Sequence, residues 1–134
     1  MKIINPKKYI RKAIIDALPD YAVFDTSVPI DAPYPDTYIT IDNINLSPTE
    51  VTKTCFEWNC DLYINLWQVQ EKGFVSSVSV EDMEEDVLNA VFNPTPFRIK
   101  DIRLIESKPM NVGHVQRIVM ILRFWVDVER KEIE

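Results

Sequence analysis

Apolar and polar residues alternate with a period of two along residues 54–69. This pattern is typical of a strand with one buried face, and it is much longer than the usual ~5–6 residues of a strand. Residues 114–128 repeat the pattern. The two stretches therefore predict long strands whose even-numbered side chains share a covered face: Phe56, Trp58, Cys60, Leu62, Ile64, Leu66, Ile118, Met120, Leu122, Phe124, Val126 and Val128.

Two other segments have the 3.6-residue periodicity of amphipathic helices. The first follows Asn5-Pro6, because asparagine caps helices and proline suits the first helical position, and Pro19 ends it. The second begins with Ser79 as its cap and stops at residues 93–96. We expect both helices to pack on one sheet face through their apolar stripes, which are Ile10, Ala13, Ile14, Ala17 and Leu18 in the first and Val80, Met83, Val87 and Val91 in the second.

The remaining segments complete an α+β pattern. Shorter strands are predicted at 21–24, 38–42 and 97–105, with a proline-rich loop at 25–37, a turn at 47–50 and a loop at 106–113. Hairpin-length connections favour an antiparallel or mixed sheet, here of four or five strands with two helices on one face. The 134 residues suit one domain, so we expect a single domain over 1–134, with 129–134 frayed.

Composition removes several kinds of chemistry. Gly73 and Gly113 lie forty residues apart, so a glycine-rich phosphate loop is excluded. One histidine, His114, and two cysteines cannot build a four-ligand zinc site. Cys55 and Cys60 fall on opposite faces of one strand, roughly 16 Å apart, and are expected to be unpaired. With no apolar run near the ~20 residues of a membrane span, we expect an intracellular protein that is not an enzyme and has no catalytic, cofactor or metal residues.

Charge is divided unevenly along the chain. The net charge is −6, yet residues 1–18 carry +4 and the remainder −10. An acidic chain is a poor general binder of nucleic acid. Cations near a helix N-terminus oppose the macrodipole, so a partner surface is the better explanation for them. That partner is either the acidic second helix of the same chain or that of a neighbouring copy. The residues concerned are Lys7, Lys8, Arg11 and Lys12 on the first helix and Glu81, Asp82, Glu84, Glu85 and Asp86 on the second.

The odd-numbered sheet face carries aromatic and arginine side chains that the helices are not expected to cover. Scattered apolar exposure is normal on monomers. Aromatic residues and arginine are also enriched at subunit interfaces, and two tryptophans with two aliphatic residues favour that reading. The candidate interface residues on this face are Tyr63, Trp67, Arg117, Arg123 and Trp125, beside Val119 and Ile121.

The order of these elements resembles the tail terminator (tail completion) proteins of long-tailed bacteriophages. The likeness spans nearly the whole chain and rests on the helix ending in Leu18-Pro19, the proline-rich loop before residues 38–41, the strand ending at residues 61–67, the Gly73 loop and the second helix. Gln68 stands where that family commonly has a serine.

The resemblance implies a structural role in the virion. Such proteins form a ring, usually a hexamer, at the head-proximal end of the tail tube, where they end tube polymerisation and present the head-joining surface. The implied partners are other copies, the tail tube protein and a head-tail connector or neck protein, with DNA passing through the lumen unbound. Localisation at the head-tail junction, and in the host cytoplasm during assembly, follows. The alternatives are another phage neck protein, a non-phage α+β binding module or small enzyme, and an acidic DNA mimic, which the basic first helix disfavours.

Overall fold

The computed structural model describes residues 4–25, 37–51, 55–69, 78–111 and 115–129. They form one five-stranded sheet in the order β1-β2-β3-β5-β4. β1 is parallel to β2, and every other neighbouring pair is antiparallel. The α+β class with a mixed sheet is therefore confirmed. The elements are α1 (Lys7–Ala17), β1 (Ala22–Phe24), β2 (Thr37–Val51), β3 (Cys55–Val69), α2 (Val78–Asn89), β4 (Arg98–Pro109) and β5 (Val115–Glu129).

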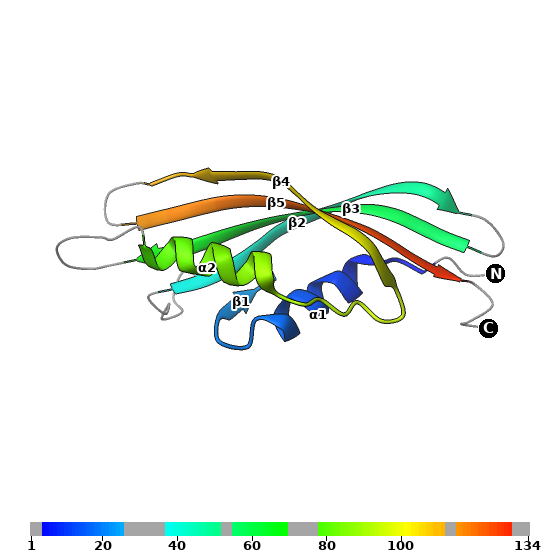
Figure 1. Cartoon of the computed structure of the whole chain (residues 1–134), viewed down its shortest axis with the longest axis horizontal. Helices are drawn as coiled ribbons and strands as arrows, with labels where there is room; N and C mark the ends of the chain where they lie inside the picture. The colour runs from blue at the N-terminus through cyan, green and yellow to red at the C-terminus, as the bar shows by residue number, and fades with distance from the viewer. Residues whose placement is uncertain (1–3, 26–36, 52–54, 70–77, 112–114, 130–134) are drawn as a thin grey trace.

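Both helices lie on the same side of the sheet (Figure 1). They cover the even-numbered face of β3 and β5, as the alternation predicted. Leu62, Ile64 and Met120 are completely buried there, and Trp58 alone of the predicted set is only half-buried. Complete burial of such a side chain stabilises the fold by about 1.5–3 kcal/mol. This face is therefore the core of the protein.

The first helix matches its predicted stripe. Ile10, Ala13 and Ile14 are buried, and α1 packs against β2. The Asn5 Oδ1 accepts a hydrogen bond from the Lys7 backbone N–H at 2.9 Å, which satisfies one of the free donors at the helix start. Asn5 thus does the work of a cap, although Pro6 occupies the N-cap position.

The second helix departs from its prediction at both ends. It begins at Val78, so Ser79 lies within the helix rather than at its cap. It ends at Asn89, which leaves Val91 outside the helical stripe and 87% exposed. Phe92 is buried instead and packs edge-on against Phe124, with ring centroids 5.4 Å apart. The prediction that Val91 belongs to the core is therefore wrong.

The predicted turn at 47–50 is also wrong, because β2 continues through it to Val51. β1 pairs only with residues 38–40, so Pro48 lies where β2 has no neighbour among the described strands on its outer side. Proline is tolerated on such an edge, because no ladder partner needs its missing N–H. Register shifts at 41–43 and 48–50 absorb the irregularity.

The fourth strand is longer than predicted. β4 extends to Pro109, so the segment predicted as a loop from 106 is largely strand, with register shifts at 99–101 and 104–106. Several predictions concern residues outside the described part of the chain: the proline-rich loop at 29–35, the Gly73 loop, His114 and the fraying of 130–134.

Candidate interaction surfaces

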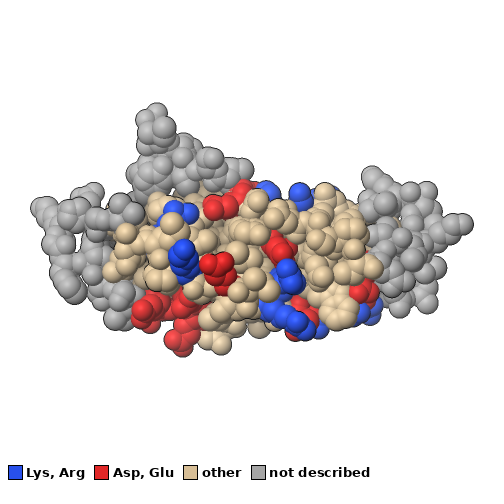
Figure 2. Space-filling model, turned by 90° about the horizontal axis from the view of Figure 1, so that it is seen from above, with Lys and Arg blue, Asp and Glu red and all other residues tan. Residues whose placement is uncertain are grey.

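The odd-numbered side chains of β3 and β5, with their neighbours on β2 and β4, form a second surface that we call the polar face. It lies on the side of the sheet away from the helices (Figure 1). The structure brings the predicted residues together there, and all five are half-buried: Tyr63, Trp67, Arg117, Arg123 and Trp125. Acidic and basic side chains are interspersed over this side of the molecule (Figure 2).

Trp67 is the centre of an aromatic group at one end of the polar face. Its ring stacks on Tyr38, with centroids 5.8 Å apart and planes inclined by 12°. The Arg117 guanidinium lies 4.6 Å from the centre of the Trp67 ring, which is a cation–π distance. The indole N–H donates to Thr40 Oγ1 at 2.9 Å. Both the faces and the edge of this tryptophan therefore have partners within the chain.

A buried amide anchors the same end. Asn65 is fully buried, and its Nδ2 donates to Asp42 Oδ2 at 2.5 Å. Arg117 Nε donates to Asn65 Oδ1 at 2.7 Å. These two hydrogen bonds join Arg117, Asn65 and Asp42 and so link β5, β3 and β2. Buried polar groups need such partners, because an unsatisfied donor or acceptor costs about 1–3 kcal/mol.

Arg123 and Asp61 form a two-point ion pair at the middle of the face. Arg123 Nε and Nη2 donate to the two carboxylate oxygens at 2.7 and 3.1 Å. The hydrogen bond to Asp61 and its negative charge raise the pKa of Arg123. The two hydrogen bonds fix the guanidinium on Asp61, and 43% of the Arg123 side chain remains exposed.

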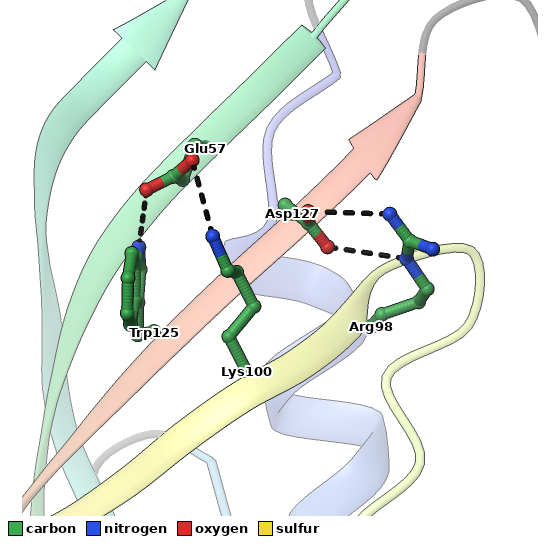
Figure 3. Close-up of polar contacts among 5 residues, drawn as sticks. All are labelled: Glu57, Arg98, Lys100, Trp125 and Asp127. Carbon is green, nitrogen blue, oxygen red and sulfur yellow. Dashed lines mark hydrogen bonds and ion pairs between the residues drawn. The ribbon is translucent and has the colours of Figure 1, made fainter.

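Glu57 organises the opposite end (Figure 3). Trp125 Nε1 donates to Glu57 Oε1 at 2.6 Å, and Lys100 Nζ lies 3.5 Å from Oε2. The same ammonium lies 4.0 Å above the Trp125 ring. Burial alone would raise the pKa of Glu57, but the hydrogen bonds from Trp125 and Thr49 and the charge of Lys100 lower it below its ordinary value.

A second ion pair stands beside this group. Arg98 on β4 donates through Nε and Nη2 to the two oxygens of Asp127 on β5, both at 3.2 Å (Figure 3). A shallow pocket of about 270 Å³ lies on this part of the polar face. It is lined by Thr49, Glu57, Asn59, Asp101, Arg103, Arg123 and Trp125. The polar face is therefore a braced, mixed-charge surface rather than an open apolar patch.

No ion pair joins the two charged helices in the part of the chain that the structure describes. Among the described residues, ion pairs join Arg98–Asp127, Lys100–Glu57, Arg103–Asp101 and Arg123–Asp61, all on the sheet. None of these four ion pairs involves the α1 cations Lys7, Lys8, Arg11 and Lys12. None involves the α2 acids, which are Glu81, Asp82, Glu84, Glu85 and Asp86. The Lys8 ammonium lies 5.0 Å from the centre of the Tyr9 ring.

Two of the α2 acids accept hydrogen bonds from neutral side chains. The Tyr21 hydroxyl donates to Asp86, and the Ser107 hydroxyl donates to Glu84. Burial, the hydrogen bond to Asp86 and nearby carboxylates raise the pKa of Tyr21 to about 12. The pairing of the two helices inside one chain, one of the two sequence alternatives, is therefore absent from the described residues.

The structure adds a surface that the sequence did not single out. Ile102, Leu104 and Ile105 on β4 are 38%, 45% and 45% exposed. The available signal was the break in alternation at residues 104–105, where two apolar residues stand together at a register shift. A shift of this kind turns the strand locally and leaves both side chains at the sheet edge.

No group of three histidine, cysteine, aspartate or glutamate side chains among the described residues is placed to hold a metal ion. No helix among them is long and apolar enough to cross a membrane.

A solved structure shares the fold of this chain. No protein-family model and no curated protein matches the chain. Among solved structures, a chain of the virion of a native gene transfer agent particle superposes with a TM-score of 0.62 and 17% sequence identity. The match covers 88% of this chain and 94% of that chain. The two chains share a fold. At this identity the likeness concerns the backbone arrangement, and it extends over nearly all of both chains.

Proposed function

We propose that this chain is a structural protein of a phage-like virion. The observation that carries the proposal is the fold shared with a gene transfer agent virion chain, at 94% coverage of that chain. A match of this extent means that the compared units have the same size as well as the same fold. The element order that resembles tail terminator proteins supports the same class.

The finer proposal is a closed ring, a hexamer by the family resemblance, at the head-proximal end of a tail tube. There the ring ends tube polymerisation and provides the surface to which the head is joined. A ring of identical copies needs a head-to-tail contact between two different surfaces of the subunit. The four α1 cations and the α2 acids are such a pair of surfaces, because neither set has an ion-pair partner within the described chain.

The polar face is proposed as the contact surface for a neighbouring virion protein, either the tail tube protein or a neck protein. Its side chains are already held by contacts with one another, so little side-chain entropy remains to be lost on binding. Arg123 and Trp125 belong to the residue types that contribute most at interfaces. A net charge of −6 is consistent with DNA passing without adhering, because phosphates are repelled from an acidic lumen.

Removal of the gene from the particle-producing genome tests the terminator role. The proposal predicts tail tubes of uncontrolled length that are not joined to heads. Tubes of normal length with unattached heads would instead assign the chain to another neck protein. Normal, infectious or gene-transferring particles would overturn the virion role. Immunogold labelling of intact particles provides a second readout, with label expected at one position between head and tail.

A further inference from the structure

Each side edge of the sheet has a stretch that no described strand covers. β1 pairs only with residues 38–40 of β2, so residues 42–51 of β2 have an open outer side within the described chain. β4 is the last strand at the other side, and no described strand pairs with its outer edge. Open edges present unpaired N–H and C=O groups, and soluble proteins usually shorten or cover them.

The two open stretches lie at the same level of the sheet. Register pairing runs in a row from Leu46 through Cys60 and Phe124 to Ile102. The next row runs from Ile44 to Leu104 through Leu62 and Leu122. Each row therefore begins with an apolar residue on the open part of β2 and ends with an exposed apolar residue on β4.

The two edges also match face by face. The rows above belong to the helix-covered side, where Ile44 is buried and Leu46 half-buried. On the polar face, the β2 positions are Asn45 and Ser47, and their row partners across the sheet on β4 are charged. If β4 of one copy is laid beside β2 of another with the faces aligned, apolar meets apolar and polar meets polar.

Strand direction agrees with this arrangement. Three antiparallel pairings separate β2 from β4, so the two strands run in opposite directions. Rotation of the neighbouring copy about an axis parallel to the strands leaves the direction of every strand unchanged. β4 of one copy therefore meets β2 of the next in the antiparallel sense that the rest of the sheet already uses.

The charges of the two edges are complementary. β4 carries four basic residues and two acidic ones: Arg98, Lys100, Arg103 and Lys108 against Asp101 and Glu106. Residues 42–47 of β2 carry Asp42 and no basic residue. Arg98, Lys100 and Arg103 already pair with acids of the same chain, so a weakly basic edge meets a weakly acidic one, and opposite charges across strands are stabilising. The favoured partner of the β4 edge is thus the β2 edge of another copy.

We propose that the outer edge of β4 pairs with residues 42–47 of β2 in the neighbouring copy, so that the sheet continues from subunit to subunit and the pairing ends before Pro48. This inference rests on the ring of the proposed function and specifies its contact. Ile102 and Leu104 then complete, across the boundary, the apolar layer that the helices cover within each copy. Because the contact is head-to-tail, it closes into a ring when the rotation between copies divides a full turn.

A mixing experiment with edge-blocked variants tests the pairing. Ile102→Lys/Leu104→Lys blocks the β4 edge, and Asn45→Lys/Ser47→Lys places two cations on the β2 edge. Val91→Lys is the matched control, because it also replaces an apolar residue, one that is 87% exposed away from both edges. The concentration for half-assembly should rise at least tenfold for each edge variant and stay unchanged for the control.

The mixture gives the decisive outcome. Each edge variant keeps one intact edge, so mixing the two should give a one-to-one dimer in native mass spectrometry. Self-association of the β2 variant through β4 alone, or full assembly of the β4 variant, would overturn the pairing. Thermal unfolding of each variant checks that it is folded.

Hydrogen exchange of the wild-type protein keeps the test independent of the variants. Assembly should slow exchange of the outward-facing amides in residues 98–108 and 42–47 at least tenfold relative to the dilute monomer. Rings that form without slower exchange in these residues would overturn the strand pairing, while the proposed ring would remain supported. Absence of any assembly would overturn both.

Discussion

Glu57 shows how single residues on the polar face depend on partners from distant parts of the chain. Its carboxylate receives Trp125 from β5 and Lys100 from β4. Alternation along β3 and β5 predicted that Trp125 lies on the face away from the helices. Lys100 was not predictable, because a register shift at residues 99–101 sets its position.

Substitution of Glu57 should change the acid sensitivity of the protein. The contacts lower the pKa of Glu57 below its ordinary value of 4.5, so its stabilising effect is present above that pH and is lost as the pH falls through the depressed pKa. Glu57→Gln should lower the free energy of unfolding by about 1 kcal/mol at pH 7. Urea denaturation from pH 7 to pH 3 should show the gap between variant and wild type narrowing in acid. A gap independent of pH would contradict the assignment.

The Cys60 thiol should be unreactive in the folded protein. Cys60 is a free cysteine and fully buried; burial, with the nearby charge of Asp61, raises its pKa to about 12. Thiolate is the nucleophilic form, so iodoacetamide at pH 8 should leave Cys60 unmodified for hours and label it rapidly in urea. The labelling is measured in a Cys55→Ser variant, so that all modification comes from Cys60, because the side chain of Cys55 lies outside the described residues. Rapid labelling under native conditions would contradict the burial.

At the scale of elements, periodicity predicted the existence of the long strands and of both helices well, and the ends of the strands and of α2 poorly. The even-numbered face of β3 and β5 and the stripe of α1 agree with the structure, because burial on one side imposes a strict period. The turn at 47–50 and the loop from 106 failed because edge strands tolerate proline and irregular register. Pro48 and Pro109 lie on outer strands, where no described neighbouring strand needs a hydrogen bond from their missing N–H. Proline was therefore read as a sign of a turn or loop where a strand continues.

Adjacent isoleucines in α1 test the packing of that helix. Ile14 is completely buried, whereas Ile15 is 40% exposed. Ile14→Ala should lower the free energy of unfolding by about 2–5 kcal/mol, because it leaves a cavity between α1 and the sheet. Ile15→Ala is the matched control and should cost less than about 1 kcal/mol. Equal losses in chemical denaturation would mean that α1 is not seated as the structure shows.

For the molecule as a whole, the sequence predicted the fold class and the separation of charge, but not the edges of the sheet. Edge position depends on strand order, which alternation within single strands does not encode. The exposed Ile102 and Leu104 acquire their meaning only once β4 is known to be the outermost strand. The candidate residues on the helices and the polar face remain predictions about contacts between molecules.

Charge reversal should reveal whether the two helices meet across the subunit boundary. Lys8→Glu/Arg11→Glu should weaken assembly about tenfold, equivalent to 1.4 kcal/mol, and added salt should weaken the wild-type assembly. Glu81→Lys/Glu85→Lys should have a similar effect. Combination of both reversals in one chain restores opposite charges and should recover assembly. Sedimentation across a salt series measures this, and failure of the combined variant to recover would contradict the pairing.

The most direct test of the central claim, a closed ring of identical copies, is the native mass of the purified wild-type protein across a concentration series. The chain mass is 15.7 kDa. A closed head-to-tail ring predicts one discrete assembly in equilibrium with monomer, at six times the chain mass if it is the hexamer that the family resemblance implies. A monomer at every concentration, or an open-ended ladder of masses, would contradict the ring.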